Sequence, residues 1–329
     1  MRDRILVFCL FGFFLASAAS MAQEVPDCGD VPGAVVLEGV GLSRPESIQW
    51  DAKTGYWYLS NQGSPTDPTD GFISRLHPDG TVDKLAWATG LGHPLGIRIF
   101  ERKLYVADRD HGASLNNAIA VFDLSSDDGA LLKTYSIGSN LTNGGGVNDP
   151  VVDKKTDAIY VSVFSLNAAL GNTVLKIPLS GDGSDAVQLA SPESLAFGHQ
   201  PNGILLDKHD LIVGNSDGEF LRADLATGEI EVLGVTAFID ANGVFDGLER
   251  IGGEYLFTKN GLPNTPFDSF LAKIRFAADG AATERKLCTM IPGEGAADIG
   301  VNRDMGIVAV PHLFQHRVTF LELSEFFEE

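Results

Sequence analysis

The stretch PESIQWDAKTGYWYLSN, residues 45–61, indicates the fold. A short run ending in a tryptophan leads into the turn-forming residues DAKTG, and a mostly aromatic and apolar run follows them. Two such runs around a tight turn predict a β-hairpin. After a loop, residues 71–88 (GFISRLHPDGTVDKLAWA) repeat the arrangement around the turn HPDG. Together the two segments predict four antiparallel strands that follow one another along the chain.

This unit returns five more times, while helical periodicity is nearly absent. The unit is read in residues 45–88, 94–137, 147–190, 201–235, 245–287 and 297–323. A repeat of about 45–50 residues is typical of the four-stranded blades of a β-propeller. The sequence therefore predicts an all-β protein, a six-bladed β-propeller.

The sixth unit contains only three strands before the chain runs into SEFFEE, residues 324–329. A missing outer strand would leave an unpaired sheet edge, which favours aggregation. Residues 34–40 (AVVLEGV) have strand character and precede the first unit without a partner of their own. We expect this N-terminal strand to complete the sixth blade and close the ring.

The chain begins with the features of a signal peptide. Arg2 and Arg4 precede the apolar run 5–15, and Ser20-Met21-Ala22 fits the small-x-small pattern of a cleavage site. We expect residues 1–22 to be removed on export to the periplasm or the extracellular space, leaving residues 23–329 as a single propeller domain. A retained membrane anchor is the alternative.

Two cysteines, Cys28 and Cys288, remain after the expected cleavage. In an exported protein such a pair suggests one disulfide, with two separate buried thiols as the alternative. If the N-terminal strand closes the ring, Cys28 lies beside the outer strand of the fifth blade, which leads into Cys288. This placement favours the disulfide.

The charge of the chain excludes some classes of partner. The formal net charge is −20, and such a surface repels nucleic-acid phosphates and anionic lipid head groups. We expect no nucleic-acid partner and no membrane partner. The expected protein is a monomer that binds a small-molecule substrate.

One register of the repeat carries oxygen-bearing side chains. The inner strands of the first, third and fourth units end on Asp51, Asp153 and Asp207 at their first turn. Five positions earlier, and at the same register of the other units, stand Glu46, Asn148, Asn202 and Asp246, with Leu95 and Ala297 in the second and sixth units. Inner strands surround the channel of a propeller, so equivalent positions converge on its axis. The alternative is that Asn and Asp stand there only because they commonly begin strands and cap turns.

Two carboxylates that face each other across a channel repel unless a cation lies between them. Glu46 and Asp246 would supply two negative charges, and the amides of Asn148 and Asn202 would add neutral oxygens. Oxygen ligands without His or Cys favour a hard divalent cation, Ca²⁺ first, with Mg²⁺, Mn²⁺ or Zn²⁺ as alternatives. These four residues are the predicted metal ligands.

The segments PESIQWD, VNDPVVD, PNGILLD and FDGLERI resemble the metal-site motifs of the gluconolactonase/regucalcin (senescence marker protein) family. The wider group includes paraoxonases and diisopropylfluorophosphatase, six-bladed propellers with calcium in the channel. The resemblance implies that Glu46, Asn148, Asn202 and Asp246 match the metal ligands of that family. Two positions depart from its pattern, because Ser47 and Pro150 stand where glycine is common.

The lengths of the loops predict which face carries the site. Connections from the second to the third strand are long in several units and emerge where the inner strands begin, as do the four predicted ligands. His77 and His209 fall in turns of the opposite face, whereas His93, His111, His199, His312 and His316 lie nearer the site. His199, three residues before Asn202, is the preferred histidine of the predicted catalytic site.

The leading hypothesis is a metal-dependent hydrolase, a lactonase or esterase-type enzyme acting on a sugar-type or other small lactone. The ion would polarise the carbonyl and lower the pKa of a water molecule. The resemblance gives Asp246 a second role as base or nucleophile. The rival is a non-catalytic exported propeller that binds a ligand or protein around a structural metal. A third hypothesis, a quinone-dependent sugar dehydrogenase, needs basic residues around its cofactor, for which mainly Arg109 and Lys259 are available.

Overall fold

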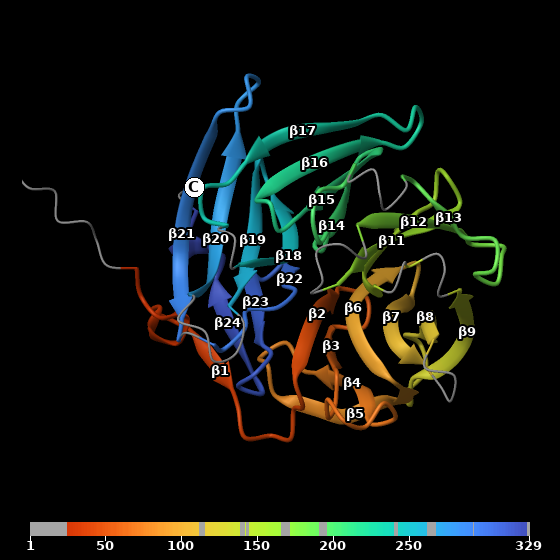
Figure 1. The fold of residues 1–329 in the computed structure, drawn as a ribbon. Helices are drawn as coiled ribbons and strands as arrows, with labels where there is room; N and C mark the ends of the chain where they lie inside the picture. Colours follow the sequence, from red (N-terminus) through yellow and green to blue (C-terminus); the bar gives the residue numbers. More distant parts are fainter. Residues whose placement is uncertain are drawn as a thin grey trace, which may run out of the picture.

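The computed structural model describes residues 25–111, 116–138, 142, 145–165, 172–190, 196–239, 243–261, 268–291 and 293–327. The predicted signal peptide, residues 1–22, lies outside the described residues, as do parts of three of the long loops. The described chain forms six four-stranded antiparallel sheets arranged around a common axis (Figure 1). The six-bladed β-propeller is therefore confirmed.

Each blade runs from its inner to its outer strand in chain order, apart from the last. Blade 1 contains β2 (Pro45–Asp51), β3 (Tyr56–Asn61), β4 (Gly71–Leu76) and β5 (Val82–Leu91). Blade 2 contains β6 (His93–Phe100), β7 (Lys103–His111), β8 (Asn116–Asp123) and β9 (Ala130–Ile137). Blade 3 contains β10 (Gly146–Asp153), β11 (Ala158–Phe164), β12 (Thr173–Pro178) and β13 (Val187–Gln188). Blade 4 contains β14 (Ile204–Asp207), β15 (Asp210–Gly214), β16 (Glu219–Asp224) and β17 (Ile230–Val235). Blade 5 contains β18 (Val244–Ile251), β19 (Glu254–Asn260), β20 (Ser269–Phe276) and β21 (Ala282–Met290). Blade 6 contains β22 (Gly300–Asn302), β23 (Ile307–His312), β24 (Arg317–Glu322) and β1 (Val35–Leu37).

The N-terminal strand closes the ring, as the sequence predicts. β1 pairs with β24 in antiparallel register, Val35 opposite Phe320 and Leu37 opposite Val318, and the two strands lie side by side in Figure 1. Before β1, the 3₁₀ turn η1 (Cys28–Asp30) lies against β21, and Cys28 is bonded to Cys288 with the two Cα atoms 4.9 Å apart. Both the closing strand and the disulfide are confirmed.

Apolar side chains of the strands fill the spaces between neighbouring blades. The described residues form six buried clusters, one at each contact between adjacent blades. Between blades 6 and 1, for example, the ring of Trp57 lies 5.7 Å from that of Phe320, and both are buried. Burial of apolar surface on both sides of every blade is the main stabilising term of such a ring.

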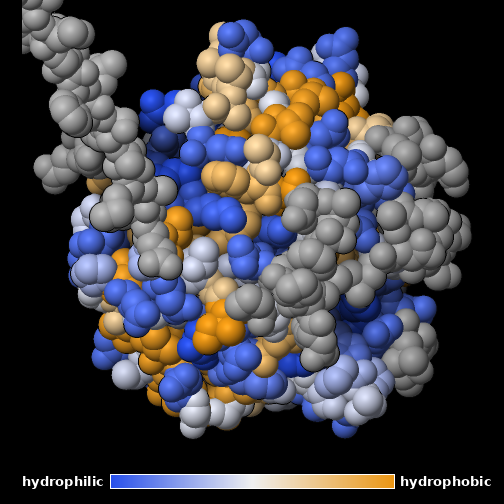
Figure 2. All heavy atoms as spheres, turned by 60° about the vertical axis from the view of Figure 1, so that its left-hand side comes forward, coloured by the Kyte–Doolittle hydropathy of each residue, from blue (hydrophilic) through white to orange (hydrophobic). Residues whose placement is uncertain are grey.

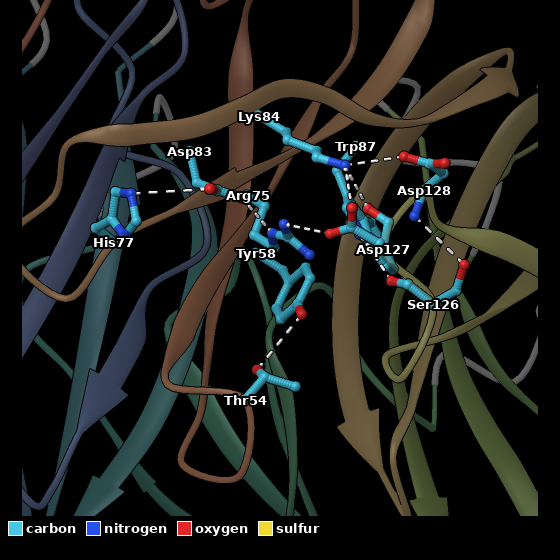
Figure 3. Close-up of polar contacts among 10 residues, drawn as sticks. All are labelled: Thr54, Tyr58, Arg75, His77, Asp83, Lys84, Trp87, Ser126, Asp127 and Asp128. Carbon is cyan, nitrogen blue, oxygen red and sulfur yellow. Dashed lines mark hydrogen bonds and ion pairs between the residues drawn. The ribbon is translucent and has the colours of Figure 1, made fainter.

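Ion pairs join neighbouring blades outside these cores. Arg75 on β4 is buried and donates to Asp83 of its own blade at 2.5 Å and to Asp127 of blade 2 at 2.9 Å (Figure 3). Lys84 on β5 reaches Asp127 and Asp128 at 2.9 Å each. The turn between β8 and β9 is thereby held against blade 1.

The outer surface is mixed in polarity. The space-filling view shows apolar residues in several areas separated by hydrophilic ones (Figure 2). No helix in the described part of the chain is long and apolar enough to cross a membrane.

Candidate metal centre in the channel

The turns at the ends of three inner strands, in blades 1, 3 and 6, share one set of side-chain contacts. The side chain of Asp51 accepts the backbone N–H groups of residues 53 and 54, and that of Asp153 those of residues 155 and 156. Asn302 does the same for residues 304 and 305 in blade 6. Side chains five positions before these anchors therefore lie at one level of the channel.

A β-bulge lies at this level in four blades. The register of the inner strand shifts between Pro45 and Ile48, Pro94 and Ile97, Val147 and Pro150, and Phe245 and Leu248. A bulge places two consecutive residues opposite one partner and re-aims their side chains. The predicted ligands Glu46, Asn148 and Asp246 are the first of the two residues in their bulges.

Hydroxyl groups on the second strands hold three of these bulges. Ser60, Ser162 and Thr258 accept the backbone N–H of the second bulge residue at 2.9, 3.1 and 2.8 Å. Ser60 also donates to the carbonyl of Leu95 in blade 2 at 2.7 Å, and Thr258 to that of Ala297 in blade 6 at 2.9 Å. Ser60 and Thr258 thus connect the bulges of blades 1 and 5 to a neighbouring blade.

The four predicted ligands each present a buried oxygen without a hydrogen-bond partner. These atoms are Glu46 Oε2, Asn148 Oδ1, Asn202 Oδ1 and Asp246 Oδ1, and the four residues are 2–5% exposed. A buried polar atom normally finds a partner, because leaving it unpaired costs about 1–3 kcal/mol. Four such atoms at one level of one channel are the expected donor set of a cation.

Two further oxygens of the same kind belong to residues that the alignment missed. Asp149 Oδ1 and Asn260 Oδ1 are also buried and unpaired, so all unpaired buried carboxyl and amide oxygens of the described residues lie in this region. Asn260, at the end of β19, donates its Nδ2 to Asp246 Oδ2 at 2.9 Å. This contact occupies one oxygen of Asp246 and leaves the other, Oδ1, without a partner.

The position after each predicted ligand forms a second level of the channel. It carries Ser47, Gly96, Asp149, Gly203, Gly247 and Asp298 in chain order. Ser47 Oγ donates to Asp298 Oδ2 at 2.5 Å and accepts the N–H of Ile97 at 3.1 Å, so one hydroxyl joins blades 6, 1 and 2. At Gly203 a Cβ would overlap the carbonyl oxygen of Asp246 in the next blade, which explains the glycine there.

Burial and mutual repulsion raise the pKa values of the carboxyl groups in the channel. Burial, followed by the charges of Asp246 and Asp298, raises the pKa of Glu46 well above its ordinary value. Burial, followed by the charge of Asp298, also raises the pKa of Asp149 well above its ordinary value. Burial raises the pKa of Asp246 to about 8 and that of Asp298 to about 6. In the absence of a cation, these carboxyls therefore hold protons at pH values where ordinary carboxyls are ionised.

Three arginines lie near these carboxyls. Burial tends to lower the pKa of Arg98, but the charges of Glu249, Asp298 and Asp149 raise it overall. Arg98 donates to Glu249 at 2.8 Å and lies towards the far end of the inner strand. Arg109 and Arg44 lie on the side of the long loops, and their charges lower the pKa of Glu46. Burial lowers the pKa values of the two arginines themselves.

The described contacts of His199 are with Asp217 and not with the four predicted ligands. Its Nδ1 lies 2.9 Å from Asp217 Oδ1, the side chain is 43% exposed, and its backbone N–H donates to the same aspartate at 2.8 Å. Within the described residues, no contact joins His199 to Asn202 or Asp246. A catalytic role of His199 stays a prediction.

The remaining histidines near this face have structural contacts. His93 lies 3.1 Å from both Asp110 Oδ2 and the carbonyl of Ser64. His312 is fully buried between Glu294 and Thr319, at 3.1 and 2.9 Å. The side chain of His111 lies outside the description.

The donor set fits a hard divalent cation. Five oxygens, those of the four predicted ligands and of Asn260, are sealed from solvent and without protein donors, and they match the ligands that Ca²⁺ and Mg²⁺ prefer. In the described parts of the chain, no three His, Cys, Asp or Glu residues form a metal-holding group. The predicted set contains only two residues of those types, Glu46 and Asp246, since its other members are amides.

Comparisons with known proteins identify the fold. No family model matches the chain, and no curated protein matches it. Among solved structures, the chain is similar to a proposed oxidoreductase (glucose dehydrogenase) from Thermus thermophilus, with 17% identity, a TM-score of 0.56, and coverage of 88% of this chain and 100% of the other. It is also similar to the RRP9 WD40 repeats (11% identity, TM-score 0.58, coverage 91% and 99%) and to the propeller of Cps50 (Swd1) from Myceliophthora thermophila (14%, 0.52, coverage 88% and 99%). At such low identity the similarity shows the β-propeller fold alone.

Proposed function

We propose that this protein is a metal-dependent hydrolase of small lactones, of the gluconolactonase/regucalcin type. One observation carries the proposal: the four residues that match the ligand motifs each present a buried, unpaired oxygen to the channel. The motif resemblance uses only residue types and spacing, whereas the unpaired oxygens come from geometry. The two lines of support are therefore independent.

Glu46, Asn148, Asn202 and Asp246 would hold the ion, with Asn260 as a further oxygen donor. When bound, a Ca²⁺ ion supplies a Lewis acid that stabilises negative charge developing on a carbonyl oxygen. Its charge would also offset the repulsion that raises the pKa values of the carboxyls in the metal-free protein.

Asp246 is the proposed base. Asn260 fixes one of its oxygens, which orients the carboxyl, and burial raises the pKa of Asp246 in the metal-free protein to about 8. With the ion bound, the positive charge would favour the deprotonated carboxylate, which is the form that can accept a proton. Asp246 would take a proton from water while the water oxygen forms a bond to the carbonyl carbon of the lactone. The ring C–O bond then breaks, the alkoxide receives the proton, and the product is a hydroxy acid.

The alternative function is a non-catalytic propeller with a structural ion. The bond of Ser47 to Asp298 and that of Thr258 to the carbonyl of Ala297 favour it, because they show that the same region ties blades together. The dehydrogenase hypothesis would need Arg109 and Lys259 to bind a cofactor, and Lys259 is buried while Arg109 is half-buried.

We further propose that the protein is exported and acts as a monomer. The disulfide between Cys28 and Cys288 supports export, because such bonds persist mainly in oxidising compartments. The negative net charge supports a soluble small-molecule substrate rather than nucleic acid or a membrane as partner.

The test combines metal analysis with hydrolysis of lactones, esters and phosphotriesters, with and without chelator. Asp246→Asn keeps an oxygen ligand but cannot accept the proton. We expect its turnover at saturating Ca²⁺ to fall by about a hundredfold or more, the usual effect of removing a general base. Asp304→Asn, in an exposed turn, is the control and should keep full turnover.

Near wild-type turnover of Asp246→Asn with a filled site would rule out its role as base. If the wild type binds calcium but hydrolyses no substrate of the three classes, the structural-ion function becomes the better explanation. His199→Ala tests the other predicted catalytic residue in the same assay. A loss of less than a few-fold would place His199 outside the chemistry.

A further inference from the structure

The opposite mouth of the channel contains a cavity of about 350 Å³. It is lined by the last residues of the inner strands of all six blades, whereas the oxygen site lies at the first residues of those strands. Its polar lining comes from Gln49, Trp50, Arg98, Glu249, Arg250 and Arg303. Apolar residues such as Val151 and Leu205 complete the wall.

The charged groups of this cavity leave positive charge in excess. Glu249 Oε1 accepts from Arg98 at 2.8 Å, and Glu249 Oε2 lies 3.3 Å from Arg303 Nη2, so one carboxylate serves two guanidinium groups. Arg250 is paired with Asp207, its own partner. Three arginines therefore face two acidic groups, although the whole chain has a net charge of −20.

The same wall has hydrogen-bond donors without acceptors. Gln49 Nε2, Trp50 Nε1, Arg98 Nε and Arg250 Nε are buried with no partner among the described residues. The oxygen site at the other mouth has the reverse imbalance, acceptors without donors. Each unpaired donor costs about 1–3 kcal/mol, so an acceptor that enters the cavity and draws these groups towards it would be favoured.

We infer that this cavity binds a small oxyanion, a carboxylate or a phosphate. Such an ion offers several acceptor oxygens and the negative charge that would balance the arginines. Guanidinium groups bind both kinds of oxyanion in a two-point geometry. A cavity of this volume is large enough to hold such an ion.

Arg98 lies between the oxyanion site and the metal centre. It bonds to Glu249 and Gln49 on the cavity side, while the charges of Asp298 and Asp149 act on it from the oxygen site. Binding of the oxyanion needs no catalysis and no metal. Failure of one proposal therefore leaves the other intact.

The test is calorimetric titration of the purified protein with sodium malonate and, separately, sodium phosphate. Ionic strength is held constant with sodium chloride. Arg303→Gln removes one charged donor whose side chain is 61% exposed, so folding should be preserved. Loss of a charge-assisted bond should weaken binding by about tenfold or more.

Arg102→Gln is the matched control. Arg102 is an exposed arginine in the turn after Phe100, on the same face but outside the cavity lining. It should change the dissociation constant by less than about twofold, as expected for a screened surface charge. Preference for malonate or phosphate identifies the class of ligand. No binding of either anion by the wild type, or equal weakening by the two variants, would overturn the inference.

Discussion

Four carboxyl groups, those of Glu46, Asp149, Asp246 and Asp298, are buried at one end of the channel, each 2–5% exposed. Burial disfavours their charged forms, and their mutual repulsion adds to this effect. The free protein therefore keeps protons on this cluster at pH values where ordinary carboxylates have lost them. Cation binding and proton binding should compete for the same oxygens.

The first prediction concerns the pH dependence of stability. Because the folded-state pKa of Asp246 is raised to about 8, the folded protein holds its proton more tightly than the unfolded chain does. This contribution is complete below the unfolded value near 4 and is lost as the pH rises to about 8. The corresponding loss for Asp298 ends near pH 6. The chelator-treated protein should therefore lose a few kcal/mol of stability between pH 5 and pH 8.

Calcium should offset this loss by binding the deprotonated carboxyls. The measurement is the midpoint of thermal unfolding with calcium and with chelator at several pH values. The difference between the two midpoints should grow with pH. A difference that stays constant from pH 5 to pH 8 would show that these carboxyls do not bind the ion.

Some residues of this site could be predicted from the sequence and others could not, and neighbouring residues show the difference. Glu46 and Asn148 stand five positions before Asp51 and Asp153, which mark the first turn in the sequence. Asp149 follows Asn148 directly, and strand alternation would place it on the opposite face. The bulge between Val147 and Pro150 re-aims it, and no short sequence pattern announces a bulge.

Hydroxyl groups on the second strands stabilise the bulges of the inner strands, and the sequence alone does not reveal this role. Ser60, Ser162 and Thr258 look like ordinary strand residues in the sequence. In the fold each accepts a backbone N–H that the bulge would otherwise leave unpaired. Residues at one register of the second strand thereby stabilise the residue pair that forms the site.

The second prediction tests this support in blade 5. Thr258→Val keeps the shape of the side chain but removes the hydroxyl between the N–H of Gly247 and the carbonyl of Ala297. Two buried backbone groups would lose a partner, so the free energy of unfolding should fall by about 1–3 kcal/mol. Thr283→Val, at an exposed position of β21 in the same blade, should change it by less than about 0.5 kcal/mol. Denaturant unfolding in the presence of chelator measures both, and equal effects would contradict the role of Thr258.

At the scale of the whole molecule, the ring of blades is closed by β1, which pairs with a strand at the other end of the chain. The order of strands within blades follows from the repeat, because each strand pairs with the next along the chain. Closure could also be predicted, since the sixth unit lacks an outer strand and β1 precedes the first blade. The short pairing of β1 with β24, Val35 to Leu37, is reinforced by the bond from Cys28 to Cys288 in blade 5.

The last prediction concerns that bond. Cys28→Ser frees the N-terminal segment from β21, and the disulfide closes a loop of 260 residues. Its loss should lower the free energy of unfolding by about 2–4 kcal/mol, the usual effect of removing a disulfide. The double variant Cys28→Ser/Cys288→Ser should be equally destabilised, and a reducing agent should lower the stability of the wild type only.

Hydrogen exchange in the variants should show earlier opening of residues 35–37 than of the inner strands. Two free thiols in the unfolded, unreduced wild type would contradict the disulfide, and unchanged stability of the variants would show that β1 and apolar packing close the ring unaided.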